Sequence, residues 1–218
     1  MDTGHRSPAT GHRMDDATTR RSAHDDLHYI RQTLAAAGHI STVPGKGLAL
    51  IGGLALIAAA VNFEFTGAPW DPRAPDATQV SDGLRVWLAL LAASLAVGAI
   101  AMRAKARRTQ QTFWSPLLRK ALGGYVAALA LGALLTGSLI AAGRLDLLPE
   151  VWLGCYGVAL VAAGGYSVSP VRWMGLCFLA VAAAAALTPA SFGLALLALG
   201  FGWLHITFGA YIAWRHDG

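Results

Sequence analysis

The chain has 218 residues, of which 55% are hydrophobic and only 13% are charged, and its formal net charge is +5. A soluble domain of this length carries about a quarter charged residues, so the composition excludes an ordinary globular protein and indicates one that crosses a membrane several times. Basic residues in such a protein mainly report its topology, so the positive charge does not indicate nucleic-acid binding.

The N-terminal part of the chain is polar and precedes the first apolar stretch. Residues 1–21 are short of large hydrophobic side chains, which predicts a disordered cytoplasmic tail. Residues 22–40 begin with Ser22 and Asp25 in a helix-capping pattern, and their apolar residues share one helical face. This second segment is therefore predicted to be an amphipathic helix lying on the inner leaflet.

Residues 41–218 contain six apolar stretches, each long enough to cross a hydrocarbon core of about 30 Å. The spans are expected at about residues 45–63, 84–102, 117–143, 148–166, 171–188 and 191–214. The predicted fold class is all-α: a polytopic bundle of six transmembrane helices with an N-terminal amphipathic interfacial helix.

The basic residues predict the orientation of these spans. Of the 17 lysines and arginines, all but Arg73, Arg85 and Arg144 fall on the side of the N-terminus. The positive-inside rule then places both termini in the cytoplasm, and we expect a multi-pass protein of the bacterial inner membrane. The basic cytoplasmic loop at residues 103–120 is expected to contact anionic lipids.

One histidine, His205, lies within the last apolar stretch. Gly202 and Gly209, three residues before it and four after it, would share its helical face. Small residues let helices approach closely, so we expect His205 to point into a tightly packed bundle and to bond a carbonyl or hydroxyl group of a neighbouring helix. Cys155 and Cys177 fall at different depths, too far apart for a disulfide.

Three stretches resemble a family of small uncharacterised bacterial membrane proteins with six spans. They are residues 25–47, 174–183 and 200–209. The resemblance extends over nearly the whole chain. It implies that His205, Cys177 and Arg31 belong to recurrent local patterns, and it implies no particular activity.

The sequence favours a non-enzymatic role: an accessory, scaffolding or regulatory subunit that packs against other membrane proteins or against further copies of itself. Few polar groups lie within the spans, and glycine-rich faces suit close helix packing. We expect no metal site, because no histidine pair has metal-binding spacing, and the favoured role requires no cofactor.

Three alternatives remain open. In the first, His205 is the single axial ligand of a haem or a chlorin, and Gly202 and Gly209 make room for the ring. The second is a small-molecule transporter. The third is an intramembrane serine protease, since Ser167 follows a glycine near span four, as the serine of the rhomboid proteases does. Ser167 is expected at the cytoplasmic face, however, and no oxyanion-stabilising donors are evident.

Overall fold

The computed structural model describes residues 44–66, 77–108, 114 and 116–216. The predicted tail and amphipathic surface helix, at 1–21 and 22–40, lie outside the described residues. Within them, nearly all residues are helical and no strand is present.

Six helical segments among the described residues are long and apolar enough to cross a membrane, which confirms the predicted all-α bundle of six spans. The first five are α2 (Gly45–Thr66), α3 (Ala77–Arg108), α4 (Pro116–Ala141), α5 (Leu148–Gly164) and α6 (Ser169–Leu187). The sixth consists of α7 (Gly193–Leu197), a π-helical segment η3 (Ala198–Leu204) and α8 (His205–His216). Two short 3-10 turns, η1 (Leu145–Leu147) and η2 (Ala190–Phe192), precede α5 and α7.

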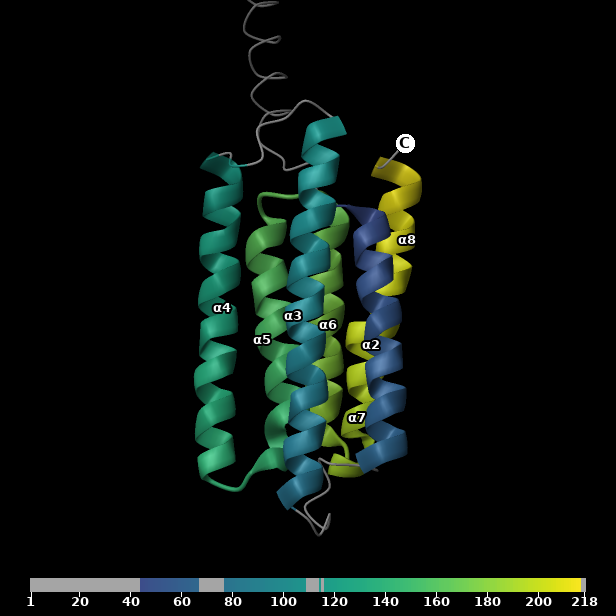
Figure 1. The fold of residues 1–218 in the computed structure, drawn as a ribbon. Coiled ribbons are helices and arrows are strands. Elements are labelled where there is room, and N and C mark those ends of the chain that lie inside the picture. The colour runs from purple at the N-terminus through teal and green to yellow at the C-terminus, as the bar shows by residue number, and fades with distance from the viewer. Residues whose placement is uncertain (1–43, 67–76, 109–113, 115, 217–218) are drawn as a thin grey trace, which may run out of the picture. The chain divides into compact units, whose positions relative to one another are not determined.

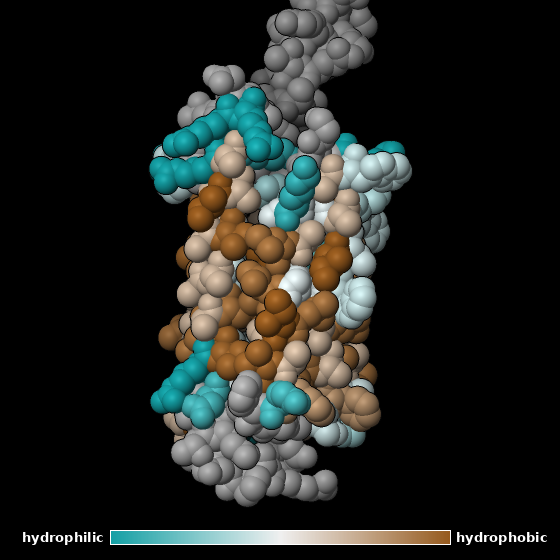
Figure 2. Space-filling model, turned by 45° about the vertical axis from the view of Figure 1, so that its right-hand side comes forward, coloured by the Kyte–Doolittle hydropathy of each residue, from teal (hydrophilic) through white to brown (hydrophobic). Residues whose placement is uncertain are grey.

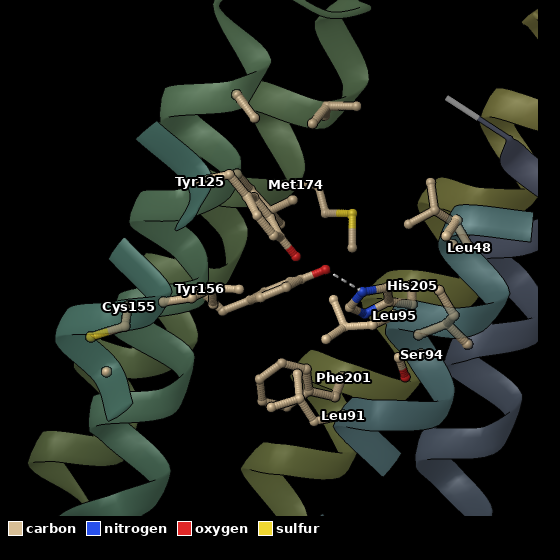
Figure 3. Close-up of a pocket in the computed structure, with 18 of the residues that line it drawn as sticks. Leu48, Leu91, Ser94, Leu95, Tyr125, Cys155, Tyr156, Met174, Phe201 and His205 are labelled. Carbon is tan, nitrogen blue, oxygen red and sulfur yellow. Dashed lines mark hydrogen bonds between the residues drawn. The ribbon is translucent and has the colours of Figure 1, made fainter. Parts of the chain in front are cut away.

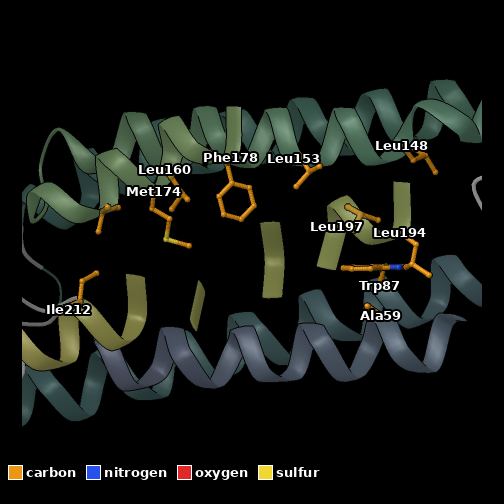
Figure 4. Close-up of a cluster of buried hydrophobic side chains, with 11 residues drawn as sticks. Ala59, Trp87, Leu148, Leu153, Leu160, Met174, Phe178, Leu194, Leu197 and Ile212 are labelled. Carbon is orange, nitrogen blue, oxygen red and sulfur yellow. The ribbon is translucent and has the colours of Figure 1, made fainter. Parts of the chain in front are cut away.

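The helices pack in two groups (Figure 1). In one group α5 packs between α4 and α6, and in the other α2 packs between α3 and the sixth span. The π-helical segment η3 joins the two groups, because it contacts both α2 and α6. Fully buried apolar side chains fill the contact between the groups: Leu153, Met174, Phe178, Leu197 and Ile212 (Figure 4).

A seam of glycines joins α2 to the sixth span. Gly45 and Gly52 of α2 face Gly209 and Gly202 so closely that a Cβ on Gly52 would lie 2.6 Å from the carbonyl oxygen of Gly202. A Cβ on Gly209 would lie 2.5 Å from the backbone nitrogen of Ala49. The predicted close packing through glycine is therefore present along this seam, where two backbones approach without intervening side chains.

The charged residues of the described part of the chain separate by sign. At one end of the bundle the charged residues are all basic: Lys46, Arg103, Lys105, Arg107, Arg108, Arg119, Lys120, Arg172 and Arg215. At the other end lie the described acidic residues with two arginines: Glu64, Asp82, Arg85, Arg144, Asp146 and Glu150. Figure 2 shows the apolar surface between the two polar ends. This is the architecture of a multi-pass membrane protein.

Candidate functional site

The six spans surround an elongated cavity of about 670 Å³, to which every span contributes lining residues. Helix α3 lines it from Trp87 to Met102, a distance of about 22 Å at 1.5 Å per residue. The cavity therefore extends along most of a hydrocarbon core of about 30 Å.

The lining is apolar and contains no charged residue among those the structure describes. Leucine, alanine and aromatic side chains make up most of it. At the acidic end, Trp152 donates its indole N–H to the hydroxyl of Thr136 at 2.9 Å, and Thr136 donates to the carbonyl of Gly132 at 2.7 Å. These two side chains satisfy each other, whereas the indole N–H of Trp87, which lines the same end of the cavity, has no hydrogen-bond partner among the described residues. Ions and strongly hydrated solutes would lose their hydration without compensation in such a space.

His205 supplies the main polar group of the cavity. Its side chain is 1% exposed, and its Nε2 atom lies 2.7 Å from the hydroxyl of Tyr156 on α5 (Figure 3). The rings of Phe178 and Phe201 lie 5.5 and 6.2 Å from the imidazole centroid. The predicted bond between His205 and a hydroxyl of a neighbouring helix is thus present.

A second tyrosine, Tyr125 of α4, extends this pair. Its hydroxyl points toward that of Tyr156 (Figure 3), and the two rings meet edge to face with their centroids 6.1 Å apart. We call Tyr125, Tyr156 and His205 the phenol–imidazole cluster. All three residues line the cavity, and their polar atoms lie near its middle rather than at either end. Because buried polar groups are costly in an apolar medium, a cluster at this depth is a polar feature that a bound molecule would meet near the middle of the cavity.

The π-helical segment sets the environment of the second imidazole nitrogen. Among the described residues, Nδ1 makes no hydrogen bond of standard geometry, but the backbone carbonyls of Gly200 and Phe201 lie close enough to act on the ring. Both carbonyls belong to η3, which ends where His205 begins. π-helical turns within α-helices are frequent at functional sites.

The structure places Gly202 and Gly209 beside α2 and away from the cavity. An added Cβ on Gly202 would meet Leu56, and one on Gly209 would meet Ala49. Neither glycine lines the cavity. The tight packing expected around His205 therefore exists on the side of α2, and again at Gly200, where an added Cβ would lie 2.4 Å from Leu153. The imidazole itself faces Tyr156 and lines the cavity.

The remaining candidates fall at separate places. Cys155 lines the cavity and Cys177 does not. Both thiols are free, as their different depths predicted. Ser167 is buried at the basic end of the cavity, and its hydroxyl has no hydrogen-bond partner among the described residues. The structure thus shows no Ser167–His205 hydrogen bond of the kind that a catalytic dyad would use.

Sequence reasoning identified His205 and missed both tyrosines. The missed signal was their position: tyrosines of membrane proteins gather at the two interfaces, whereas Tyr125 and Tyr156 lie well inside α4 and α5. A tyrosine deep within an apolar span needs a hydrogen-bond partner. That requirement could have linked them to the single intramembrane histidine.

No family model matches the chain, and no curated protein or solved structure gives a significant match.

Proposed function

We propose that this protein binds a small, elongated, apolar molecule from the bilayer in its central cavity. The observation that carries this proposal is an uncharged cavity of about 670 Å³ with one polar cluster near its middle. Ligand pockets have this general composition: apolar walls and a few polar groups that fix orientation. On this proposal the protein is a binding protein and has no catalytic role.

The packing of the helices supports access from the lipid side. Helix α3 packs mainly on α2, and α4 packs mainly on α5. Leu88 and Leu91 of α3 and Ala133 of α4 are exposed on the bundle surface and also line the cavity. The cavity therefore communicates with the lipid-facing surface between α3 and α4. An apolar molecule can pass there without crossing water.

A photoreactive alkyl probe tests the proposal. The protein in lipid nanodiscs is labelled with hexadecyl diazirine, and the modified peptides are mapped by mass spectrometry. We expect saturable labelling of peptides that line the cavity. Gly98→Phe should reduce it, because Gly98 lines the cavity and an added Cβ there meets no atom within 4 Å. Gly53→Phe is the matched control, since that glycine also has open space around it but does not line the cavity.

Labelling that rises in proportion to the probe, and that is equal in the two variants, would show only lipid-facing contact. That result would contradict a binding cavity.

A second proposal, membership of a larger membrane complex, is supported by the outer face of α4. Gly123, Ala127, Ala130 and Gly137 are exposed on this face, and an added Cβ on Gly123 or Gly137 meets no atom within 4 Å. Small residues permit close approach of a further helix, whether from another protein or another copy. Gly137→Leu should then reduce the size of the particle isolated in mild detergent, and an unchanged size would contradict the proposal.

The haem or chlorin alternative has less support from the geometry. An axial ligand needs a free imidazole nitrogen that faces a ring-sized space, whereas Nε2 of His205 is engaged by Tyr156. Gly202 and Gly209, which were expected to make room for the ring, face α2. An absorption spectrum of the protein isolated from native membranes, compared with that of His205→Ala, tests the alternative. A Soret-type band that is present in the wild type and lost in the variant would support the haem or chlorin alternative.

We also propose that the basic end of the bundle faces the cytoplasm of a bacterial inner membrane, where it contacts anionic lipids. The separation of charge between the two ends supports this orientation, because basic residues accumulate on the cytoplasmic side.

A further inference from the structure

We infer that the molecule bound in the cavity has an aromatic ring at one end and a hydrocarbon chain at the other. Its ring lies among the aromatic side chains of the cavity, and its chain extends toward the basic end of the bundle. This inference rests on the proposed binding function and adds the chemical class of the ligand and its orientation.

The aromatic side chains of the lining occupy one half of the cavity. They extend from near the middle of the bundle to the acidic end, and we call them the aromatic wall: Trp87, Tyr125, Trp152, Tyr156, Phe201 and the imidazole of His205. These rings form a continuous series in which neighbouring centroids are 5.2 to 6.1 Å apart. A ligand in this half of the cavity therefore lies against aromatic side chains along its length.

The half of the cavity toward the basic end has no aromatic side chain among the described lining residues, and aliphatic side chains predominate there. Helices α3 and α4 contribute Leu95, Met102 and Leu122, and α6 contributes Val171 and Met174. Side chains of this kind pack well against a hydrocarbon chain through many weak contacts. The two halves thus differ in chemistry, and a ligand with two unlike ends matches both.

Four rings of the aromatic wall retain surface that a ligand can cover. Tyr125, Trp152, Tyr156 and Phe201 are half-buried and line the cavity, whereas Phe178, which does not line it, is fully buried in the core. An aromatic ligand ring gains more on such a surface than its apolar area alone provides, because offset-stacked and edge-to-face ring pairs are favourable. A saturated ring of the same size lacks this gain.

Two matched hydrocarbons, 1-phenyldodecane and 1-cyclohexyldodecane, test the ligand class, because they share one carbon skeleton and differ only in the aromaticity of the ring. Each competes with hexadecyl diazirine for saturable labelling of the full-length protein in nanodiscs, and its amount is expressed as a mole fraction of the bilayer. We expect phenyldodecane to compete at a mole fraction about twofold to tenfold lower. In Phe201→Leu this preference should fall by about twofold or more, since the change keeps an apolar side chain and removes one ring. Phe192→Leu is the matched control, because Phe192 is exposed and does not line the cavity, and it should retain the preference.

Two photoreactive forms of phenyldodecane test the orientation. One carries a trifluoromethyl diazirine on the ring, and the other carries a diazirine at the end of the chain. The first should label peptides of α5 and η3 that contain Trp152, Tyr156 and Phe201. The second should label residues 95–102 of α3 and 118–122 of α4. Reversed labelling, or the same labelling by both forms, overturns the inference.

The outcomes separate the inference from the function on which it rests. If the two hydrocarbons compete equally, if the saturated one is preferred, or if neither competes while labelling by hexadecyl diazirine remains saturable, the aromatic class is wrong and the binding function stands. A preference that is unchanged in Phe201→Leu, or that falls equally in Phe192→Leu, also overturns the inference, since each preference is measured within one variant and does not depend on its stability. If labelling is not saturable, the binding function itself fails.

Discussion

The bond between Tyr156 and His205 joins two residues that are 49 positions apart and belong to different helix groups. Without this bond, Nε2 of His205 would be buried with no partner. The bond links α5 to the sixth span. The pair therefore combines a structural role, by joining the two groups, with a chemical role at the middle of the cavity.

Replacing Tyr156 by phenylalanine tests the structural role. The change keeps the ring and removes the hydroxyl, so Nε2 of His205 loses its hydrogen-bond partner while it stays buried. We expect a loss of about 1–3 kcal/mol in the free energy of unfolding, measured by denaturant or thermal unfolding in detergent. Tyr166→Phe is the control, because Tyr166 is exposed and its loss should change stability little. Equal stability of the two variants would mean that the bond contributes nothing to the fold.

Cys155 and Cys177 provide a natural pair for probing the cavity, since only Cys155 lines it. In nanodiscs, an elongated apolar molecule that enters the cavity, such as farnesol, should slow the alkylation of Cys155 by N-ethylmaleimide and leave the rate at Cys177 unchanged. The rates are read by mass spectrometry, with Cys155→Ser and Cys177→Ser identifying each site. Equal slowing at both thiols would indicate a general effect of farnesol on the bilayer, and no occupancy of the cavity.

At the scale of elements, the sixth span has different contacts on its two sides. Gly202 and Gly209 face α2 and His205 faces the cavity, although the spacing of these three residues predicts one shared face. The π-helical segment Ala198–Leu204 changes the helical register just before His205. A close-packed contact and an open site can therefore lie beside each other on one helix.

The seam of glycines between α2 and the sixth span predicts that one added methyl group will strongly lower the stability of the protein. In Gly209→Ala the new Cβ would lie 2.5 Å from the backbone nitrogen of Ala49, and a backbone cannot move aside as a flexible side chain can. We expect destabilisation of about 1–3 kcal/mol from overpacking, measured by unfolding in detergent. Gly53→Ala should cost little, because no atom lies within 4 Å of its added Cβ and alanine favours the helix. If the two variants unfolded alike, close packing at the seam would contribute nothing to the stability of the protein.

At the scale of the whole molecule, the charge separation predicts which end an impermeant reagent can reach. In a background of Cys155→Ser and Cys177→Ser, we introduce Ser191→Cys at the acidic end or Arg108→Cys at the basic end, where both residues are exposed. In intact bacterial cells, an impermeant maleimide should label the Ser191→Cys variant directly. It should label the Arg108→Cys variant only after the cells are permeabilised. The reverse pattern would invert the proposed orientation.

The prediction from sequence succeeded for properties that are local along the chain. The length and hydropathy of each segment fix the six spans, because a helix is the structure that satisfies its own backbone in a hydrocarbon medium. The position of His205 in an apolar segment fixes its need for a partner on another helix, because an unpaired imidazole there is costly. The separation of basic from acidic residues is also already present in the sequence.

Only the tertiary structure decided which helices meet. The partner of His205 could have been any hydroxyl or carbonyl group at its depth, and the choice of Tyr156 depends on how α5 lies beside the sixth span. The cavity exists because α3 and α4 pack on different neighbours, a property of no single segment. The sequence by itself determined how many times the chain crosses and where its charges lie, since backbone hydrogen bonding and hydration act residue by residue. Helix-to-helix packing, a collective balance of many weak contacts, decided where the space for a ligand would be.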